Sequence, residues 1–134
     1  MGRDRFSGKT AIVTGAASGI GAAITQALVD EGAQVFAVDL EVDAFGQLSD
    51  SVATHACDVS DSKQVNAMVD AAFERFGRID LLFNNAGVGC LAETPDMDDE
   101  TWENVFAVNV HAILYACRAV IPKMREQGGG AIVN

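Results

Sequence analysis

The chain has 134 residues, of which 49% are hydrophobic and 21% charged, a size and composition that suit one globular domain with its own core. Its net charge of −10 argues against binding to nucleic acid or to an anionic membrane surface, because either partner would require a basic face. Three cysteines without metal-ligand spacing, a charged N-terminus and the lack of an uninterrupted apolar run of membrane-spanning length predict a cytoplasmic protein that does not enter membranes.

Short apolar runs alternate along the chain with segments of helical periodicity. Strands are expected at residues 9–14, 34–38, 54–57, 79–83 and 131–133, and helices at 20–31, 61–76 and 99–125. The strands are mostly apolar throughout rather than alternating, which indicates a parallel sheet buried on both faces. The pattern therefore predicts one Rossmann-like, doubly wound α/β domain over residues 1–134, with strand order 3-2-1-4-5.

Each expected helix carries an apolar stripe that we expect to face the core. The stripe of the first helix consists of Ile20, Ala23, Ile24, Ala27 and Leu28. That of the second consists of Val65, Met68, Val69, Ala72, Phe73 and Phe76, and that of the third of Trp102, Val105, Phe106, Val110, Ile113, Leu114, Cys117 and Ile121. The second helix also has clear ends. Ser60 or Asp61 can cap its start, Gln64 lies three residues after Asp61 as in a capping box, and Gly77 closes the helix.

A glycine-rich turn, Thr14-Gly15-Ala16-Ala17-Ser18-Gly19-Ile20-Gly21, joins the first expected strand to the first helix. A helix N-terminus favours a bound phosphate, and glycines let the backbone approach that phosphate closely. The same glycines would also suit a turn that only packs a helix against its strand. The position of the motif between an expected strand and an expected helix favours the phosphate site.

An acidic residue, Asp39, lies at the end of the second expected strand, twenty residues after Gly19. A carboxylate there can accept hydrogen bonds from both hydroxyls of an adenosine ribose and would repel the 2′-phosphate of NADP. The glycine-rich turn contains no Lys or Arg that would attract that phosphate. The sequence thus predicts NAD(H) rather than NADP(H), the alternative being an ordinary solvated Asp at a strand end.

Polar residues also follow the third and fourth expected strands, namely Asp58 and the run Asn84-Asn85-Ala86-Gly87. Strand ends of a parallel sheet meet at one edge, so these residues are expected to converge on the glycine-rich turn, although the same residue types are common in loops. Asn109 is placed within the apolar stripe of the longest helix. Its carboxamide either is satisfied by neighbouring backbone or orders a water or a backbone group beside a reaction centre, because an unpaired buried amide costs about 1–3 kcal/mol.

Taken together, these motifs resemble those of the short-chain dehydrogenase/reductase family, and the matching residues span the whole chain. They are the glycine-rich turn, Asp39, Asp58-Val59, Asn84-Asn85-Ala86-Gly87 and Val108-Asn109-Val110. The resemblance implies that Gly15, Ser18, Gly19 and Ile20 hold the phosphates and the nicotinamide end of the cofactor, with Gly21 and Gly87 in the same cofactor-binding set. It further implies that Asp39 holds the adenosine ribose, that Asp58 and Val59 border the adenine, and that Asn85 contacts the second ribose. Asn109 matches the family's catalytic Asn, which supports a proton-relay water.

The family's catalysis also requires a Ser after the strand at 131–133 and a Tyr-x-x-x-Lys motif beyond it. Neither is present, because no Ser follows Ser62 and the only Tyr, Tyr115, is followed four residues later by Ala119. We therefore expect the cofactor-binding part of such an enzyme, truncated before strands 6 and 7, without its substrate-binding part and inactive alone. The strand at 131–133 would then be an exposed edge that favours association or aggregation.

The expected function is that of an NAD(H)-dependent oxidoreductase that transfers hydride between nicotinamide and a small-molecule secondary alcohol or ketone. By resemblance, the full-length form is a homo-oligomer, either a dimer or a tetramer. The alternative is a non-catalytic NAD(H)-binding module. A methyltransferase also uses a strand–glycine–helix turn, but it would give Asn109 and the run at 84–87 no role.

Overall fold

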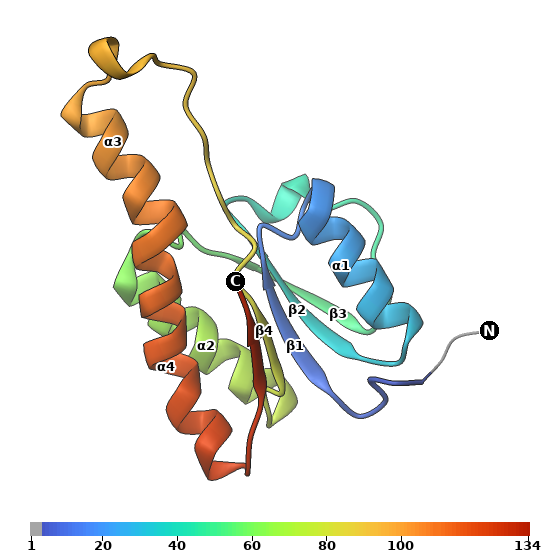
Figure 1. Ribbon diagram of the computed structural model, residues 1–134. Coiled ribbons are helices and arrows are strands. Elements are labelled where there is room, and N and C mark those ends of the chain that lie inside the picture. The colour runs from blue at the N-terminus through green and yellow to red at the C-terminus, as the bar shows by residue number, and fades with distance from the viewer. Residues whose placement is uncertain (1–3) are drawn as a thin grey trace.

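The computed structural model describes residues 4–134 and consists of one parallel sheet between two layers of helices (Figure 1). The strands are β1 (Thr10–Thr14), β2 (Gln34–Asp39), β3 (Val52–Ala56), β4 (Leu81–Phe83) and β5 (Ala131–Val133). Their order in the sheet is β3-β2-β1-β4-β5, and every neighbouring pair is parallel. The fold class and the strand order expected from the sequence are both confirmed.

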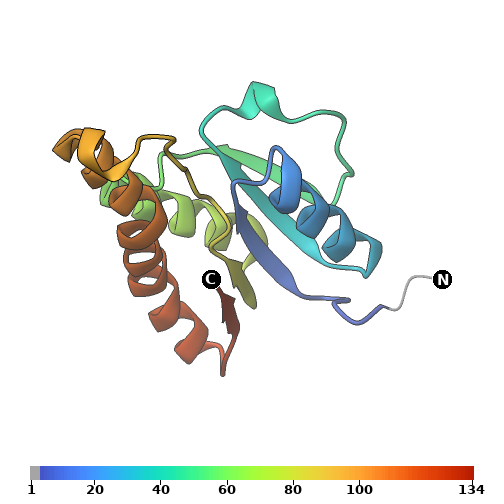
Figure 2. The ribbon, with the colours of Figure 1, turned by 45° about the horizontal axis from the view of Figure 1, so that its top comes forward.

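Helix α1 (Gly19–Asp30) covers one face of the sheet, whereas α2 (Ser62–Phe76) and α4 (Ala112–Glu126) cover the other (Figures 1 and 2). A 3₁₀ turn, η1 (Val42–Ala44), lies between β2 and β3, and a second, η2 (Thr94–Asp96), lies in the long loop after β4. The chain crosses from the α1 face to the α2 face between β3 and β4. The carboxyl ends of β1 and β4 consequently border the gap between the two halves of the fold, which is where such sheets bind ligands.

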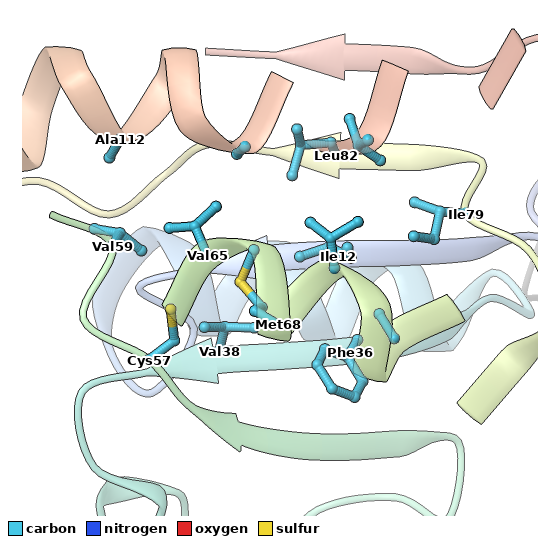
Figure 3. Close-up of a cluster of buried hydrophobic side chains, with 14 of the residues drawn as sticks. Ile12, Phe36, Val38, Cys57, Val59, Val65, Met68, Ile79, Leu82 and Ala112 are labelled. Atoms are coloured by element: carbon cyan, nitrogen blue, oxygen red, sulfur yellow. The ribbon is translucent and has the colours of Figure 1, made fainter. Parts of the chain in front are cut away.

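The core consists of two apolar clusters separated by the sheet. On the α2 face, Ile12, Val38 and Leu82 meet Val65 and Met68, and all five side chains are fully buried (Figure 3). On the α1 face, the strand residues that pack against α1 are Ala11, Val13, Val35 and Ala37. Successive residues of β1 thus enter opposite clusters, which explains its uninterrupted apolar sequence.

Helix α2 begins and ends where the sequence predicts. Asp61 accepts hydrogen bonds from the backbone N–H groups of Lys63 (2.8 Å) and Gln64 (3.4 Å), and Gly77 ends the helix with φ of +75°. The expected stripe is buried at Val65, Met68, Val69 and Ala72. One detail differs, because Gln64 Oε1 accepts the N–H of Asp58 (2.9 Å) rather than that of Asp61. Gln64 therefore ties the end of β3 to the start of α2.

The expected stripe of α1 is confirmed at Ile24 and Leu28, which contact the core, and was wrong at its other three positions. Its buried residues are Gly21, Thr25 and Leu28, whereas Ile20 is 74% exposed and Ala23 and Ala27 are exposed. The reason is close packing at the start of the helix, since a Cβ added at Gly21 would lie 2.0 Å from the carbonyl oxygen of Gly15. The smallest residue therefore faces the turn and sets which side of the helix is buried.

The longest helix runs without interruption from Asp99 to Glu126, through α3 (Asp99–Phe106), the π-helical turn η3 (Ala107–His111) and α4. Its expected stripe was also largely wrong. The buried residues are Ala112, Ala116, Val120 and Met124, and the large residues that are instead exposed are Trp102, Phe106, Val110 and Leu114. Two of the four buried residues are alanines, whose small side chains let α4 approach the sheet and α2 closely.

By length and composition alone, the helix from Asp99 to Glu126 is long and apolar enough to cross a membrane. The core helices of proteins that never enter a bilayer pass the same test. The expectation that the chain does not enter membranes stays a prediction.

Candidate cofactor-binding site

A pocket of about 550 Å³ opens at the edge of the sheet where the strands end. It is lined by Gly15, Ser18, Gly19, Ile20, Val38, Asp39, Leu40, Cys57, Asp58, Val59, Ser60, Asn85, Ala86, Gly87, Val88, Asn104 and Val108. Every residue that the sequence assigns to cofactor binding lines this pocket except Gly21. The structure therefore brings together residues that lie up to 72 positions apart in the sequence.

The glycine-rich turn forms one wall of the pocket. Gly15 and Gly19 have φ of +64° and +54°, which favour glycine. Ser18 caps α1 with an extended backbone, and its side chain makes no capping hydrogen bond. The first N–H groups of the helix have no acceptor within the helix. Gly21 lies behind this wall, where it gives the turn room rather than a ligand contact.

The carboxylate of Asp39 lies at the end of β2, beside the turn. Its Oδ2 accepts the backbone N–H of Ala17 (2.9 Å) and its Oδ1 accepts that of Leu40 (2.8 Å). Each carboxylate oxygen has a further lone pair that can accept a ribose hydroxyl. Among the residues that line the pocket, all within the described part of the chain, none is Lys or Arg.

On the β3 side, Asp58 and Val59 line the pocket next to Cys57. Asp58 Oδ1 accepts hydrogen bonds from the N–H (2.9 Å) and the hydroxyl (2.6 Å) of Ser60. Burial, reinforced by the negative charges of Asp58 and Asp61, raises the pKa of the Cys57 thiol to about 11. Cys57 is therefore protonated at neutral pH and contributes a neutral, unreactive surface to the pocket.

Thr14 and Asn85 join the ends of β1 and β4. Thr14 Oγ1 accepts the N–H groups of Asn85 (3.1 Å) and Ala86 (3.0 Å), and Asn85 Nδ2 donates to the carbonyl oxygens of Thr14 (3.1 Å) and Gly15 (3.3 Å). The Asn85 amide thus holds the glycine-rich turn in addition to lining the pocket. Sequence reasoning gave Thr14 no role, although its place immediately before Gly15 was the available signal.

Asn109 lies in the π-helical turn and pairs with the loop after β4. Its Oδ1 accepts the N–H of Val88 and its Nδ2 donates to the carbonyl oxygen of Val88, both at 2.8 Å. Asn109 does not itself line the pocket, but Val88 does. Its carboxamide is therefore satisfied by backbone and orders a segment of the pocket wall, and the relay water implied by resemblance stays a prediction.

Two further pocket residues, Asn104 and Val108, come from α3 and η3. Sequence reasoning missed Asn104 because the strand-end rule points only to loops that follow strands. The four-residue spacing to Val108, on the same side of the helix, was the available signal.

Comparisons with known proteins agree with this arrangement. Residues 9–134 match a protein family described as short chain dehydrogenase. The chain is 45% identical to D-threitol dehydrogenase of Mycolicibacterium smegmatis and 37% identical to 3beta-hydroxysteroid dehydrogenase 2 of Eggerthella lenta, over 97% and 96% of its length. It covers 53% of each of these relatives. The crystal structure of levodione reductase matches with a TM-score of 0.89 and 36% identity, over 97% of this chain and 54% of that chain. The chain thus spans about half the length of the curated relatives that it matches.

Proposed function

The chain belongs to the short-chain dehydrogenase family, and from this premise we propose that it supplies the cofactor-binding part of an NAD(H)-dependent oxidoreductase. The reaction is the interconversion of a secondary alcohol and a ketone. The observation that carries the proposal is that the glycine-rich turn and the Asp39 carboxylate face one pocket, whose lining residues include no basic side chain. That combination favours a dinucleotide whose adenosine ribose carries free hydroxyls.

The residues of the pocket fit such a dinucleotide. The turn at 15–20 offers backbone N–H groups and a free Ser18 hydroxyl to the phosphates, and Asp39 offers lone pairs to the adenosine ribose. Asp58 and Val59 border the adenine. Asn85 and Gly87 line the pocket at the end of β4, and we assign them to the nicotinamide side. When bound, NAD(H) supplies the hydride acceptor or donor.

Asn109 acts on this site in two ways. It fixes Val88 in the pocket wall through two hydrogen bonds. Its Oδ1 retains a second lone pair that can accept a water proton, which supports the relay role.

The substrate is a small-molecule secondary alcohol or the corresponding ketone. The names of the relatives support this class, because one acts on D-threitol and another on a 3β-hydroxysteroid. The test uses the intact protein that carries this chain, NAD⁺, and a panel of polyols and hydroxysteroids deuterated at the carbinol carbon. We expect NADH to form and to carry the deuterium. The absence of NADH with every alcohol, or NADH without deuterium, would contradict the proposed reaction.

A second function that we propose is a non-catalytic NAD(H)-binding module. It is supported by the pocket, whose lining residues all lie within the described part of the chain. We expect the 134 residues alone to bind NADH without turnover. If the intact protein also binds NADH but oxidises no alcohol, the module is the better description.

We further propose that a second copy covers an exposed apolar face on the longest helix, consisting of Trp102, Phe106, Val110 and Leu114. Trp102 is 54% and Leu114 56% exposed, and the rings of Trp102 and Phe106 lie against each other at a tilt of 35°, with centroids 4.8 Å apart. A contiguous apolar patch of this kind marks an interaction surface more often than a solvated one. A homo-oligomer, either a dimer or a tetramer, would bury it.

A further inference from the structure

One polar side chain in the pocket wall is not used by the function proposed above. Asn104 lines the pocket from α3, and its carboxamide makes no hydrogen bond to any residue between 4 and 134. The other amide and the carboxylates of the wall are engaged, at Asn85, Asp39 and Asp58. Asn104 therefore presents an uncommitted donor and an uncommitted acceptor to the space that the dinucleotide would fill.

The position of Asn104 places it on the adenine side of the pocket. Val108, one helical turn further on, lines this pocket and also a small neighbouring cavity that it shares with Val59. That cavity is also lined by Thr14, Asn84 and Ala86, so the α3–η3 side of the pocket lies near the ends of β1, β3 and β4. Asp39 pairs in register with Ala56 of β3, so a base attached to a ribose at Asp39 extends toward Asp58 and Val59. Asn104 and Asp58 both line this pocket, Asn104 from α3 and Asp58 from the segment after β3.

We propose that Asn104 recognises the adenine of NAD(H), and that it is a specificity-determining residue of the site. This inference rests on the proposed NAD(H) function. An Asn side chain can accept a hydrogen bond from the N6 amino group of adenine through Oδ1 and donate one to N7 through Nδ2. The N6 amino group has a second proton for the Asp58 carboxylate, which can only accept. Asn104 thus adds a side-chain amide donor, which the Asp58 carboxylate cannot supply.

The test compares two dinucleotides, NADH and reduced nicotinamide hypoxanthine dinucleotide, in which a carbonyl oxygen replaces the N6 amino group. Dissociation constants are measured by calorimetry for the intact wild-type protein and for Asn104→Ala. The carbonyl oxygen of hypoxanthine would face Asn104 Oδ1, and two acceptors repel each other. The wild type should therefore bind NADH more tightly than the hypoxanthine dinucleotide. We expect Asn104→Ala to weaken NADH binding about tenfold and to change binding of the hypoxanthine dinucleotide less than about twofold, because only adenine loses both hydrogen bonds.

Asn66→Ala is the matched control, because it makes the same chemical change at an exposed position of α2 away from the pocket. It should leave both dissociation constants unchanged. Alanine is the better helix former at both positions, so neither variant should unfold. If Asn104→Ala weakens both dinucleotides equally, or neither, the inference is wrong while the proposed function stands. If the wild type binds no dinucleotide, the proposed function fails, and the inference fails with it.

Discussion

Thr14 and Asn85 hold each other reciprocally at the carboxyl ends of the neighbouring strands β1 and β4, where the Thr14 hydroxyl accepts the Asn85 N–H and the Asn85 amide donates to the Thr14 carbonyl oxygen. The two strands lead into the glycine-rich turn and the Asn84–Gly87 segment, which contact each other and form adjoining walls of the pocket. The relative position of these walls therefore depends on one hydroxyl and one carboxamide that sequence reasoning had not linked.

Removing the Thr14 hydroxyl should destabilise the fold. Thr14 is 3% exposed, and Thr14→Val keeps its shape while leaving the N–H groups of Asn85 and Ala86 without their acceptor. We expect a loss of about 1–3 kcal/mol in the free energy of unfolding, measured by urea denaturation. Thr14→Ser keeps the hydroxyl and should recover most of that loss. Equal stability of Thr14→Val and the wild type would show that the pairing contributes little.

Gly21→Ala should disrupt the turn. The added Cβ would lie 2.0 Å from the Gly15 carbonyl oxygen and 2.7 Å from Asn85 Nδ2, so backbone must move. We expect a loss of about 3 kcal/mol or more in stability and at least tenfold weaker NADH binding. Gly46→Ala is the control, since a Cβ there meets nothing within 4 Å. A Gly21→Ala protein with wild-type stability and affinity would contradict the close packing described for α1.

Asp80 should make stability depend on acid pH. Burial by itself would raise the pKa of Asp80, but hydrogen bonds from Arg78 and the Thr10 N–H, with the charges of Arg78 and Lys9, outweigh burial and lower it. A carboxyl whose pKa is lowered on folding stabilises the protein above the unfolded value of about 3.9, and the contribution is lost as pH falls through the folded value.

Asp80→Asn should therefore be less stable than the wild type at neutral pH, and the difference should narrow as pH falls below about 4. Denaturation at a series of pH values measures it. Asp43→Asn, at an exposed position in η1, should match the wild type at neutral pH. If the difference in the free energy of unfolding between Asp80→Asn and the wild type stays constant down to the acid transition, the negative charge of Asp80 is not what stabilises the fold.

The exposed apolar face predicts an effect on assembly. Phe106 and Leu114 lie on that face two turns apart, and Leu114→Arg would place a charge at the C-terminal end of the face. We expect the intact wild-type protein to sediment as a dimer or tetramer at micromolar concentration and Leu114→Arg to shift toward the monomer. Asn66→Arg, on α2, should leave the oligomeric state measured by sedimentation unchanged. A monomeric wild type would contradict the proposed assembly.

The sequence predicts the order of the strands and the composition of the pocket well, because strand ends of a parallel sheet must converge. It predicts α2 well because Asp61, Gly77 and a regular stripe all agree on one helix. It does not predict which face of α1 or α4 is buried. Periodicity identifies an apolar stripe, but the face that packs on the core is the one with small residues, because these allow the helix to approach the sheet closely. They are Gly21 in α1 and Ala112 and Ala116 in α4.

The roles of individual polar residues in the site are harder to predict for a related reason. Asn85 and Asn109 were both assigned by resemblance to cofactor or catalysis, and both use their amides on neighbouring backbone. A sequence motif shows which residue type is present. It does not show which lone pairs and N–H groups the fold itself uses.

The measurement that tests the account most directly is the affinity of the intact protein for NADH and for NADPH, with and without the Asp39 carboxylate. By calorimetry, we expect the wild type to bind NADH at least tenfold more tightly than NADPH, because the carboxylate accepts ribose hydroxyls and repels a 2′-phosphate. Asp39 also accepts the N–H of Ala17, so Asp39→Ala should weaken both ligands. The ratio of the two affinities is therefore the decisive quantity, and it should fall toward one in Asp39→Ala. Equal or tighter binding of NADPH by the wild type would contradict the central claim that this pocket is built for NAD(H).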